Sequence, residues 1–178
     1  MYNVSKTEKG YLQQRKIEDA LFEYMKQRFF EDITVVDICE KAEVTRRIFY
    51  RHYSNKLGAL QAMLDHRVGD FVKTQENKDR IRLVAFLKFM KEQRELLSVI
   101  YKNGFNELFL ERILVYLMEN EDLRKKFGLY DAHDGYAVLY FNLSGLMGLI
   151  NIWHKNGYDK TLDEMEKLVV RLMAKPIV

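Results

Sequence analysis

Residues that break helices or crosslink chains are scarce in this sequence of 178 residues. It has one proline, nine glycines and one cysteine. Because sheets and long loops need turn residues in quantity, their scarcity beside abundant leucine, lysine and glutamate favours an all-α protein. The single cysteine, Cys39, has no partner in the same chain, which excludes an intrachain disulfide and fits a reducing cytoplasm.

The sequence also has few features of an exported or membrane protein. No continuous apolar run approaches the roughly 20 residues that a membrane span requires. The N-terminal residues MYNVSKTEKGY lack the apolar core of a signal peptide. We therefore expect a cytoplasmic protein without a membrane partner. The net charge is only +3, so the overall charge alone does not mark a nucleic-acid binder.

Motifs for catalysis or metal binding are missing from the sequence as well. The four histidines are scattered, and no His-x3-His or Glu-x-x-His pair places two ligands on one helix face. Gly145 and Gly148 do not follow a strand, so they are not a nucleotide-binding fingerprint. We expect no catalytic residue, no metal and no cofactor, and we do not expect an enzyme.

Two short helices joined by a tight turn are predicted for residues 34–56, TVVDICEKAEVTRRIFYRHYSNK. Thr34 is a favourable N-cap for the first, and Thr45 for the second. Phe49 and Tyr53 lie four residues apart in the second helix and point inward. This is the layout of a helix-turn-helix. The buried face of the first short helix is marked by Val35, Ile38, Cys39 and Ala42.

The second short helix lies in a locally basic stretch. Between Val44 and Leu64 the chain has four arginine or lysine residues and no aspartate or glutamate, whereas acids and bases are mixed almost everywhere else. A local positive field results, which suits a nucleic-acid surface. The helical spacing leaves the following residues on outward faces: Arg46, Arg47, Tyr50 and Arg51.

This stretch resembles the DNA-binding domain of the TetR (tetracycline repressor) family of bacterial regulators. The family pattern runs roughly T-hydrophobic-x-x-I-A-x-x-A-G-V-S, then a few variable residues, then Y-x-H-F and S-x-K. Two positions depart from it. Glu43 replaces the usual glycine, which predicts a turn without a positive φ, and Ile48 replaces a small residue or threonine. The matching residues are Thr34, Val35, Ile38, Cys39, Ala42, Val44, Thr45, Tyr50, His52, Tyr53, Ser54 and Lys56.

The resemblance implies a three-helix DNA-binding domain over residues 1–54 and a helical regulatory and dimerisation domain over residues 55–178. A first helix from about Glu8 to Phe29 packs on the two short helices, and a helix capped by Ser54 or Asn55 continues into the second domain without a flexible linker. The resemblance also implies phosphate contacts from Thr34, Tyr50, His52 and Lys56. The full set of predicted DNA-binding residues is Thr34, Thr45, Arg46, Arg47, Ile48, Tyr50, Arg51, His52 and Lys56.

Further helices are predicted at 79–93, 95–102, 106–120, 130–155 and 162–174. Gly145 and Gly148 lie inside the apolar run YFNLSGLMGLINIW, where each costs about 1 kcal/mol relative to alanine, so we expect a close helix approach. In the TetR family the last two long helices pack against those of a second subunit. Close packing inside one subunit is the alternative. The predicted interface residues are Gly145, Gly148, Ile152, Leu168 and Leu172.

The C-terminal half is rich in phenylalanine, tyrosine and methionine. Such residues at helical spacing are ordinarily core, but the corresponding helices of the TetR family commonly enclose a pocket for an apolar or aromatic small-molecule effector. The candidate effector-binding residues are Phe86, Met90, Tyr101, Phe109, Tyr140 and Met147.

The leading interpretation is therefore a homodimeric, sequence-specific transcription regulator that binds a double-stranded, roughly palindromic DNA operator. It would act as a repressor that a small-molecule effector releases from the operator. The alternative keeps DNA binding but makes the C-terminal domain a docking surface for a partner protein, without a small-molecule pocket. A solvent-exposed patch of tyrosine and phenylalanine in place of a closed cavity would favour that alternative.

Overall fold

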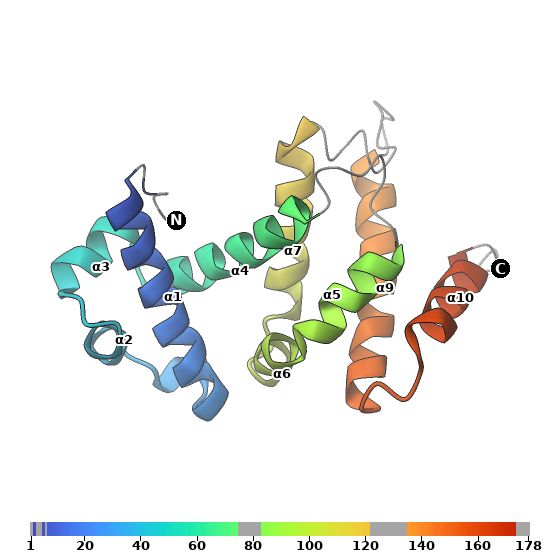
Figure 1. Cartoon of the computed structure of the whole chain (residues 1–178), viewed down its shortest axis with the longest axis horizontal. Helices are drawn as coiled ribbons and strands as arrows, with labels where there is room; N and C mark the ends of the chain where they lie inside the picture. The colour runs from blue at the N-terminus through green and yellow to red at the C-terminus, as the bar shows by residue number, and fades with distance from the viewer. Residues whose placement is uncertain (1, 3–4, 6, 75–82, 122–134, 174–178) are drawn as a thin grey trace. The chain divides into compact units, whose positions relative to one another are not determined.

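The computed structural model describes residues 2, 5, 7–74, 83–121 and 135–173, and this part of the chain has an all-α fold, as predicted (Figure 1). An isolated bridge between Tyr2 and Tyr53 and a short 3-10 turn, η1 (Phe30–Asp32), accompany the helices. The α-helices are α1 (Glu8–Gln27), α2 (Val35–Lys41), α3 (Arg46–His52), α4 (Lys56–Lys73), α5 (Leu83–Glu92), α6 (Arg94–Lys102), α7 (Asn106–Glu119), α9 (Gly135–Lys155) and α10 (Leu162–Met173).

The residues form two compact units. The first unit comprises Met1–Gly69 and Val99–Arg112, and the second comprises Asp70–Ser98 and Ile113–Val178. Helices α4, α6 and α7 therefore contribute residues to both units. The predicted functional boundary between residues 54 and 55 stays a prediction. The starts of the helices predicted at 79 and 130, and the predicted break at Gly128, lie outside the described residues.

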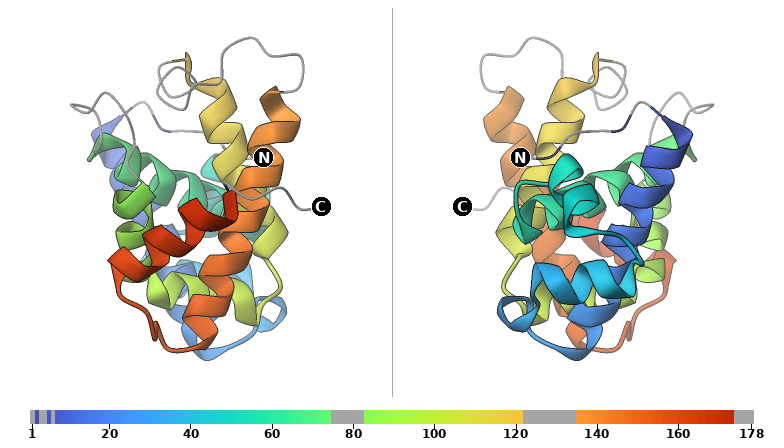
Figure 2. Two further views of the ribbon diagram at one scale, coloured as in Figure 1. Left: turned by 90° about the vertical axis from the view of Figure 1, so that its right-hand side faces the viewer. Right: turned by 90° about the vertical axis from the view of Figure 1, so that its left-hand side faces the viewer.

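The first unit is built on α1, which packs on α2 and α3 (Figure 2). Thr7 caps α1 because its Oγ1 accepts a hydrogen bond of 3.2 Å from the Gly10 amide. The apolar stripe Ile17, Leu21 and Met25 is fully buried. The helix ends at Gln27, two residues before the predicted end, because the backbone becomes extended at the next residue and re-enters a helical turn at η1.

Residues of the connection between α6 and α7 hold η1 in place within the first unit. The Phe30 amide donates a 2.7 Å hydrogen bond to Oδ1 of Asn103, and the ring of Phe30 meets that of Phe105 edge to face at 5.0 Å. Such edge-to-face contacts suit the opposite charges of ring edge and ring face. The connection between α1 and α2 is therefore fixed by residues about seventy positions away in sequence.

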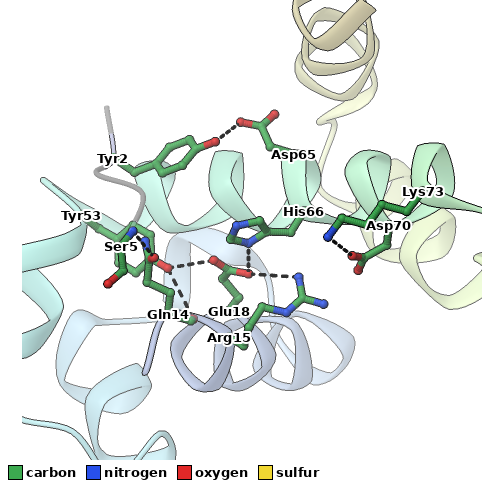
Figure 3. A network of polar contacts seen from close by, with 10 residues as sticks. All are labelled: Tyr2, Ser5, Gln14, Arg15, Glu18, Tyr53, Asp65, His66, Asp70 and Lys73. Carbon is green, nitrogen blue, oxygen red and sulfur yellow. Dashed lines mark hydrogen bonds and ion pairs between the residues drawn. The ribbon is translucent and has the colours of Figure 1, made fainter. Parts of the chain in front are cut away.

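A buried carboxylate joins three helices of the first unit (Figure 3). Glu18 is 1% exposed, yet its oxygens accept hydrogen bonds of 2.8 Å from the Tyr53 hydroxyl and contact Nδ1 of His66 at 2.8 Å. Arg15 lies 3.7 Å away. Burial and the neighbouring carboxylate raise the pKa of the Tyr53 hydroxyl, which therefore stays a donor. These contacts connect α1, the end of α3 and α4.

A second ion pair connects α4 to the part of α7 in the first unit. The Arg112 guanidinium donates two hydrogen bonds of 2.7 Å to the Asp65 carboxylate, and the Tyr2 hydroxyl donates to the same carboxylate. The hydrogen bond to Asp65 raises the pKa of Arg112. Bidentate arginine–carboxylate pairs have a defined geometry, so this pair fixes the orientation of both side chains.

The second unit is organised by α5, α9 and α10. Trp153 near the end of α9 is 1% exposed and its indole N–H donates a 3.1 Å hydrogen bond to the Lys160 carbonyl. Met165 and Val169 are the buried residues of α10. The predicted breaks at Asn103–Gly104 and Asn156–Gly157 are confirmed, and both glycines have a positive φ, of 71° and 65° respectively.

Among the described residues, one helix is long and apolar enough to cross a membrane, judged by length and composition only. It is α9, in which an 18-residue window has a mean hydropathy of 1.3 and 22% of its residues buried. The sequence has no continuous apolar run of this length, but an interrupted run can reach this mean hydropathy. Uncharged polar residues such as Asn142 and Ser144 interrupt the apolar run but lower its mean hydropathy too little. Core helices of soluble proteins pass the same test.

The expected turn without a positive φ at Glu43 is also wrong, since Glu43 has a φ of 54°. The amide of Val44 donates to the Cys39 carbonyl at 3.0 Å, and that of Glu43 donates to the Glu40 carbonyl at 3.2 Å. This is the Schellman pattern, which places the residue after the C-cap in the left-handed region. The hydrogen-bond requirement of the helix end therefore outweighs the steric preference of Glu43.

We expect Glu43→Gly to stabilise the protein by about 0.5–1 kcal/mol, because glycine adopts a positive φ without steric strain. Urea denaturation with an unchanged m-value would measure this effect. Glu40→Gly is the matched control: it replaces the same exposed residue type within α2 and should destabilise by about 0.5–1 kcal/mol. Equal destabilisation by both substitutions would contradict the strain at Glu43.

Candidate nucleic-acid interface

The first helix of the pair, α2, begins at a complete capping box. The Asp37 amide donates to Oγ1 of Thr34 at 3.1 Å, and the Thr34 amide donates to Oδ2 of Asp37 at 2.8 Å. The Thr34 hydroxyl also donates to that carboxylate at 2.9 Å. These hydrogen bonds, backbone first, lower the pKa of Asp37. The hydroxyl of Thr34 thus has a structural role at the position where the sequence implies a phosphate contact.

The second helix, α3, presents its basic residues to solvent, as predicted. Thr45 caps it, with Oγ1 accepting from the Ile48 amide at 3.3 Å. Phe49 and Tyr53 are 0% and 1% exposed, which confirms their predicted inward orientation. The burial of this side of α3 leaves the other side free of the core. The exposed residues are Arg46, Arg47, Tyr50 and Arg51.

Arg51 differs from the other exposed arginines because its guanidinium is held in place. Its Nη2 donates a 2.7 Å hydrogen bond to Oε1 of Gln13 on α1. Ile48, which is half-buried, lies on the same side of α3. The basic surface of α3 therefore has one positioned guanidinium beside α1.

Lys56 has a structural role that the sequence pattern did not indicate. Its ammonium donates hydrogen bonds of 2.8, 3.0 and 3.1 Å to the carbonyls of Phe30, Glu31 and Ile33, and it lies 4.6 Å from the Phe30 ring centre. Because an ammonium has three N–H donors, all of them are used. Its predicted phosphate contact stays a prediction, and in the free protein Lys56 stabilises the connection between α1 and α2.

His52 lies inward, although the resemblance implies a phosphate contact for it. The residue is 5% exposed, and its Nε2 is buried without a hydrogen-bond partner. Burial, followed by the charge of Arg51, lowers the pKa of its imidazole. His52 lines a cavity between α3 and the N-terminal end of α1. Sequence reasoning missed the α1 side of this cavity, where the signal was the cap residue Thr7 and the neighbouring Lys9.

The candidate effector residues are divided between the two units. Tyr101 and Phe109 belong to the first unit and the other four to the second. Phe109 and Met90 are each 1% exposed. No single unit therefore gathers the predicted set, and its role in effector binding stays a prediction. The remaining members are Phe86, Tyr140 and Met147.

The candidate dimer residues lie on α9 and α10 of the second unit. A Cβ atom added to Gly145 or Gly148 would meet no described atom within 4 Å, so no described part of this chain packs closely there. Leu168 is half-buried. Phe141 and Ile152, each four residues from one of the glycines, are exposed apolar residues on the same side of α9, and α10 also exposes Val170 and Leu172.

Comparisons with known proteins give a curated relative and several solved structures that are similar to this chain. No family model matches the chain. A curated relative, the uncharacterized HTH-type transcriptional regulator YxbF of Bacillus subtilis (strain 168), is 24% identical over 148 residues, which cover 72% of this chain. The match covers 39% of that relative, so the chain spans about two fifths of its length.

Solved structures share the fold along nearly the whole chain. Lin0861 from Listeria innocua has a TM-score of 0.77 and 18% identity, with 96% of this chain and 94% of that chain covered. A TetR transcriptional regulator from Streptococcus agalactiae 2603V has a TM-score of 0.67 and 18% identity, with 94% and 96% covered. At these identities the likeness shows the fold.

The lowered pKa of His52 predicts a pH dependence of stability. Because the unfolded state binds the proton at an ordinary value near 6.5, the free energy of unfolding should fall as the pH drops through that value. His52→Gln keeps the size and polarity but does not titrate. Its urea-unfolding free energy should fall less between about pH 8 and pH 5 than that of the native protein. An equal change in the free energy of unfolding with pH in the two proteins would contradict the lowered pKa of His52.

Proposed function

We propose that this chain, which has the fold of TetR-family transcription regulators, is a sequence-specific DNA-binding regulator. The observation that carries the proposal is α3, a capped helix with one side buried in the core and exposed arginines on the other. Helix-turn-helix proteins place such a second helix in the major groove, with its N-terminal residues at base edges. Arg46 and Arg47 occupy that N-terminal position.

The proposed regulator acts as a homodimer on a roughly palindromic operator. Support comes from the exposed apolar side of α9, where Gly145 and Gly148 leave room for a second helix. Two copies related by a two-fold axis would present two α3 helices to half-sites about one helical turn, or a multiple of it, apart. The same face accounts for the apolar composition of α9 without a membrane.

The proposed regulator is a cytoplasmic repressor that a small-molecule effector releases from DNA. Two polar atoms support an effector site in the second unit: Oγ of Ser144 and Oδ1 of Asn151 are buried without partners. They lie seven residues apart, on one face of α9. Buried polar groups normally have partners, so this pair is suited to anchor a ligand among apolar side chains. An effector that favours a state with the wrong spacing of α3 helices would weaken DNA affinity reciprocally.

Docking of a partner protein is the second candidate function of the C-terminal half. It is favoured by the exposed Tyr136, Tyr140 and Phe141 on α9, since large exposed apolar patches mark interaction sites. Such a partner would compete for the face that we assign to the dimer. The oligomeric state of the protein therefore distinguishes the two assignments.

Substitution of Arg46 or Arg47 tests base reading. A duplex is first recovered by selection with the intact protein from random-sequence DNA. Arg46→Ala and Arg47→Ala should each weaken binding to that duplex by about 1–3 kcal/mol if the side chain reads a base, and relax the preference at one position. Arg94→Ala removes an exposed arginine of the second unit and should leave affinity unchanged. Retained affinity and preference in both α3 variants would exclude α3 from recognition.

Substitution of Gly148 tests the dimer. Gly148→Leu should produce monomers, because the added side chain fills the space left for a second helix. Operator affinity should fall with it, since a monomer reads one half-site. Gly148→Ala is the matched control, which should stay dimeric and gain helix stability of about 1 kcal/mol. Sedimentation velocity measures the oligomeric state. A Gly148→Leu protein that stays dimeric and keeps its full affinity for the operator would place the dimer interface elsewhere.

A further inference from the structure

Three polar side chains of the second unit lie in a continuous line of hydrogen bonds. Nε2 of His154, near the end of α9, is 3.1 Å from Oγ of Ser98 on α6. Nδ1 of the same ring is 2.9 Å from the hydroxyl oxygen of Tyr158, which follows α9. Because Ser98 and His154 are far apart in sequence, no local motif indicates this contact. The fold thus places a serine hydroxyl, an imidazole and a phenol side by side.

The imidazole of His154 is suited to act as a base. Burial lowers its pKa from the ordinary value of 6.5, so the ring is uncharged at neutral pH. A neutral imidazole has one N–H donor and one acceptor nitrogen. Burial raises the pKa of Tyr158 against the opposing charge of Arg94, so its hydroxyl stays protonated. In the tautomer whose Nδ1–H donates to the Tyr158 oxygen, Nε2 is the acceptor that faces Ser98.

The hydroxyl of Ser98 is accessible and lies within reach of that nitrogen. Ser98 is exposed, so a small molecule can approach its oxygen. Its Oγ is 3.0 Å from the Arg94 carbonyl oxygen and 3.1 Å from Nε2 of His154, and rotation about one bond turns its single hydrogen to either acceptor. A nucleophile beside a base, with the base oriented by a third group, is the arrangement that activates a serine.

Tyr158 has an unfavourable backbone conformation, with a φ of 61°. The end of α9 accounts for the positive φ of Gly157, because the Gly157 amide donates to the His154 carbonyl and the Tyr158 amide to the Trp153 carbonyl. That pattern requires one left-handed residue, and Tyr158 is a second. A positive φ is uncommon for a bulky residue. Strain of this kind persists where the surroundings fix it, and it is frequent at functional sites.

The side-chain contacts of Tyr158 keep its hydroxyl at the imidazole. Its ring meets the ring of Trp153 edge to face, with the ring centres 5.0 Å apart, and Trp153 is buried. The ammonium of Lys91 lies 5.7 Å from the Tyr158 ring centre and 5.4 Å from that of Trp153. The phenol is therefore anchored to the core of the second unit, and its position sets the orientation of the His154 ring.

We propose that Ser98 is an activated nucleophile that accepts an acyl group from small esters with a good leaving group. The Ser98 oxygen bonds to the acyl carbon, and its proton moves to Nε2 of His154. The bond between the acyl carbon and the leaving oxygen breaks, and the leaving group departs with that proton. Water deprotonated by the same imidazole then releases the free acid and restores Ser98. Tyr158 is a positioning residue for His154. This activity goes beyond DNA binding and does not depend on it.

The test measures acylation of the full chain by p-nitrophenyl acetate. The native protein should release a burst of p-nitrophenol of about one equivalent per chain, the sign of an accumulating acyl intermediate. Peptide mapping by mass spectrometry should place the acetyl group on Ser98. Ser98→Ala should abolish the burst, and His154→Gln should slow it about 100-fold, the contribution of a general base. Ser54→Ala is the matched control: it removes another exposed serine, in the first unit, and should leave the burst unchanged.

The role of Tyr158 is tested by Tyr158→Phe, which keeps the ring and removes the hydroxyl. Acylation should become about 10–100-fold slower because the imidazole loses its orientation, while the burst amplitude stays at one equivalent. In the native protein the burst rate should fall as the pH drops through the pKa of His154, which burial holds below 6.5. In His154→Gln this pH dependence should disappear. A general loss of folding would lower the amplitude instead of the rate.

Distinct results would overturn the proposal. A burst retained in Ser98→Ala with the acetyl group on His154 would make the imidazole the nucleophile. Acetyl groups found on lysines alone would exclude an activated serine. An unchanged rate in His154→Gln would exclude the base, and an unchanged rate in Tyr158→Phe would leave Tyr158 a structural role only. None of these results bears on the proposed DNA-binding function, which is tested separately with α3.

Discussion

The buried carboxylate of Glu18 is the contact on which the candidate interface depends. An ionised carboxyl group inside a protein is strongly unfavourable unless donors surround it. Here the donors come from different helices: Tyr53 directly follows α3, and His66 lies on α4. Moving α3 relative to α1 would remove the Tyr53 hydroxyl from the carboxylate. The orientation of α3 is therefore coupled to a polar group as well as to apolar packing.

The arrangement of α3 follows from this anchoring. The helix is only seven residues long, too short to be stable alone, so its packing determines both its existence and its orientation. Phe49 and Tyr53 fill the core, which turns the arginines of the opposite side outward. Lys56 reinforces the same domain by binding three carbonyls of the preceding connection. The domain that exposes the basic surface of α3 is therefore itself stabilised by a basic residue, Lys56.

Several elements could be predicted from sequence because their causes are local. Caps at Thr34 and Thr45 mark the starts of α2 and α3, and glycines at 104 and 157 mark helix ends. Glu43 shows where local reasoning fails. Its residue type disfavours a positive φ, but the carbonyls at the end of α2 require the left-handed turn. The hydrogen bonds at the end of α2 therefore outweigh the backbone preference of this single residue.

The sequence by itself determined the helical class, the two short capped helices and the outward arginines, since helix periodicity and capping act over a few residues. Only the tertiary structure decided that His52 is buried, that Lys56 binds backbone carbonyls, and that Thr7 and Lys9 adjoin α3. The physical reason is distance along the chain. Contacts such as Phe30 with Asn103, or Asp65 with Arg112, join residues far apart in sequence, and no local pattern specifies which residues meet.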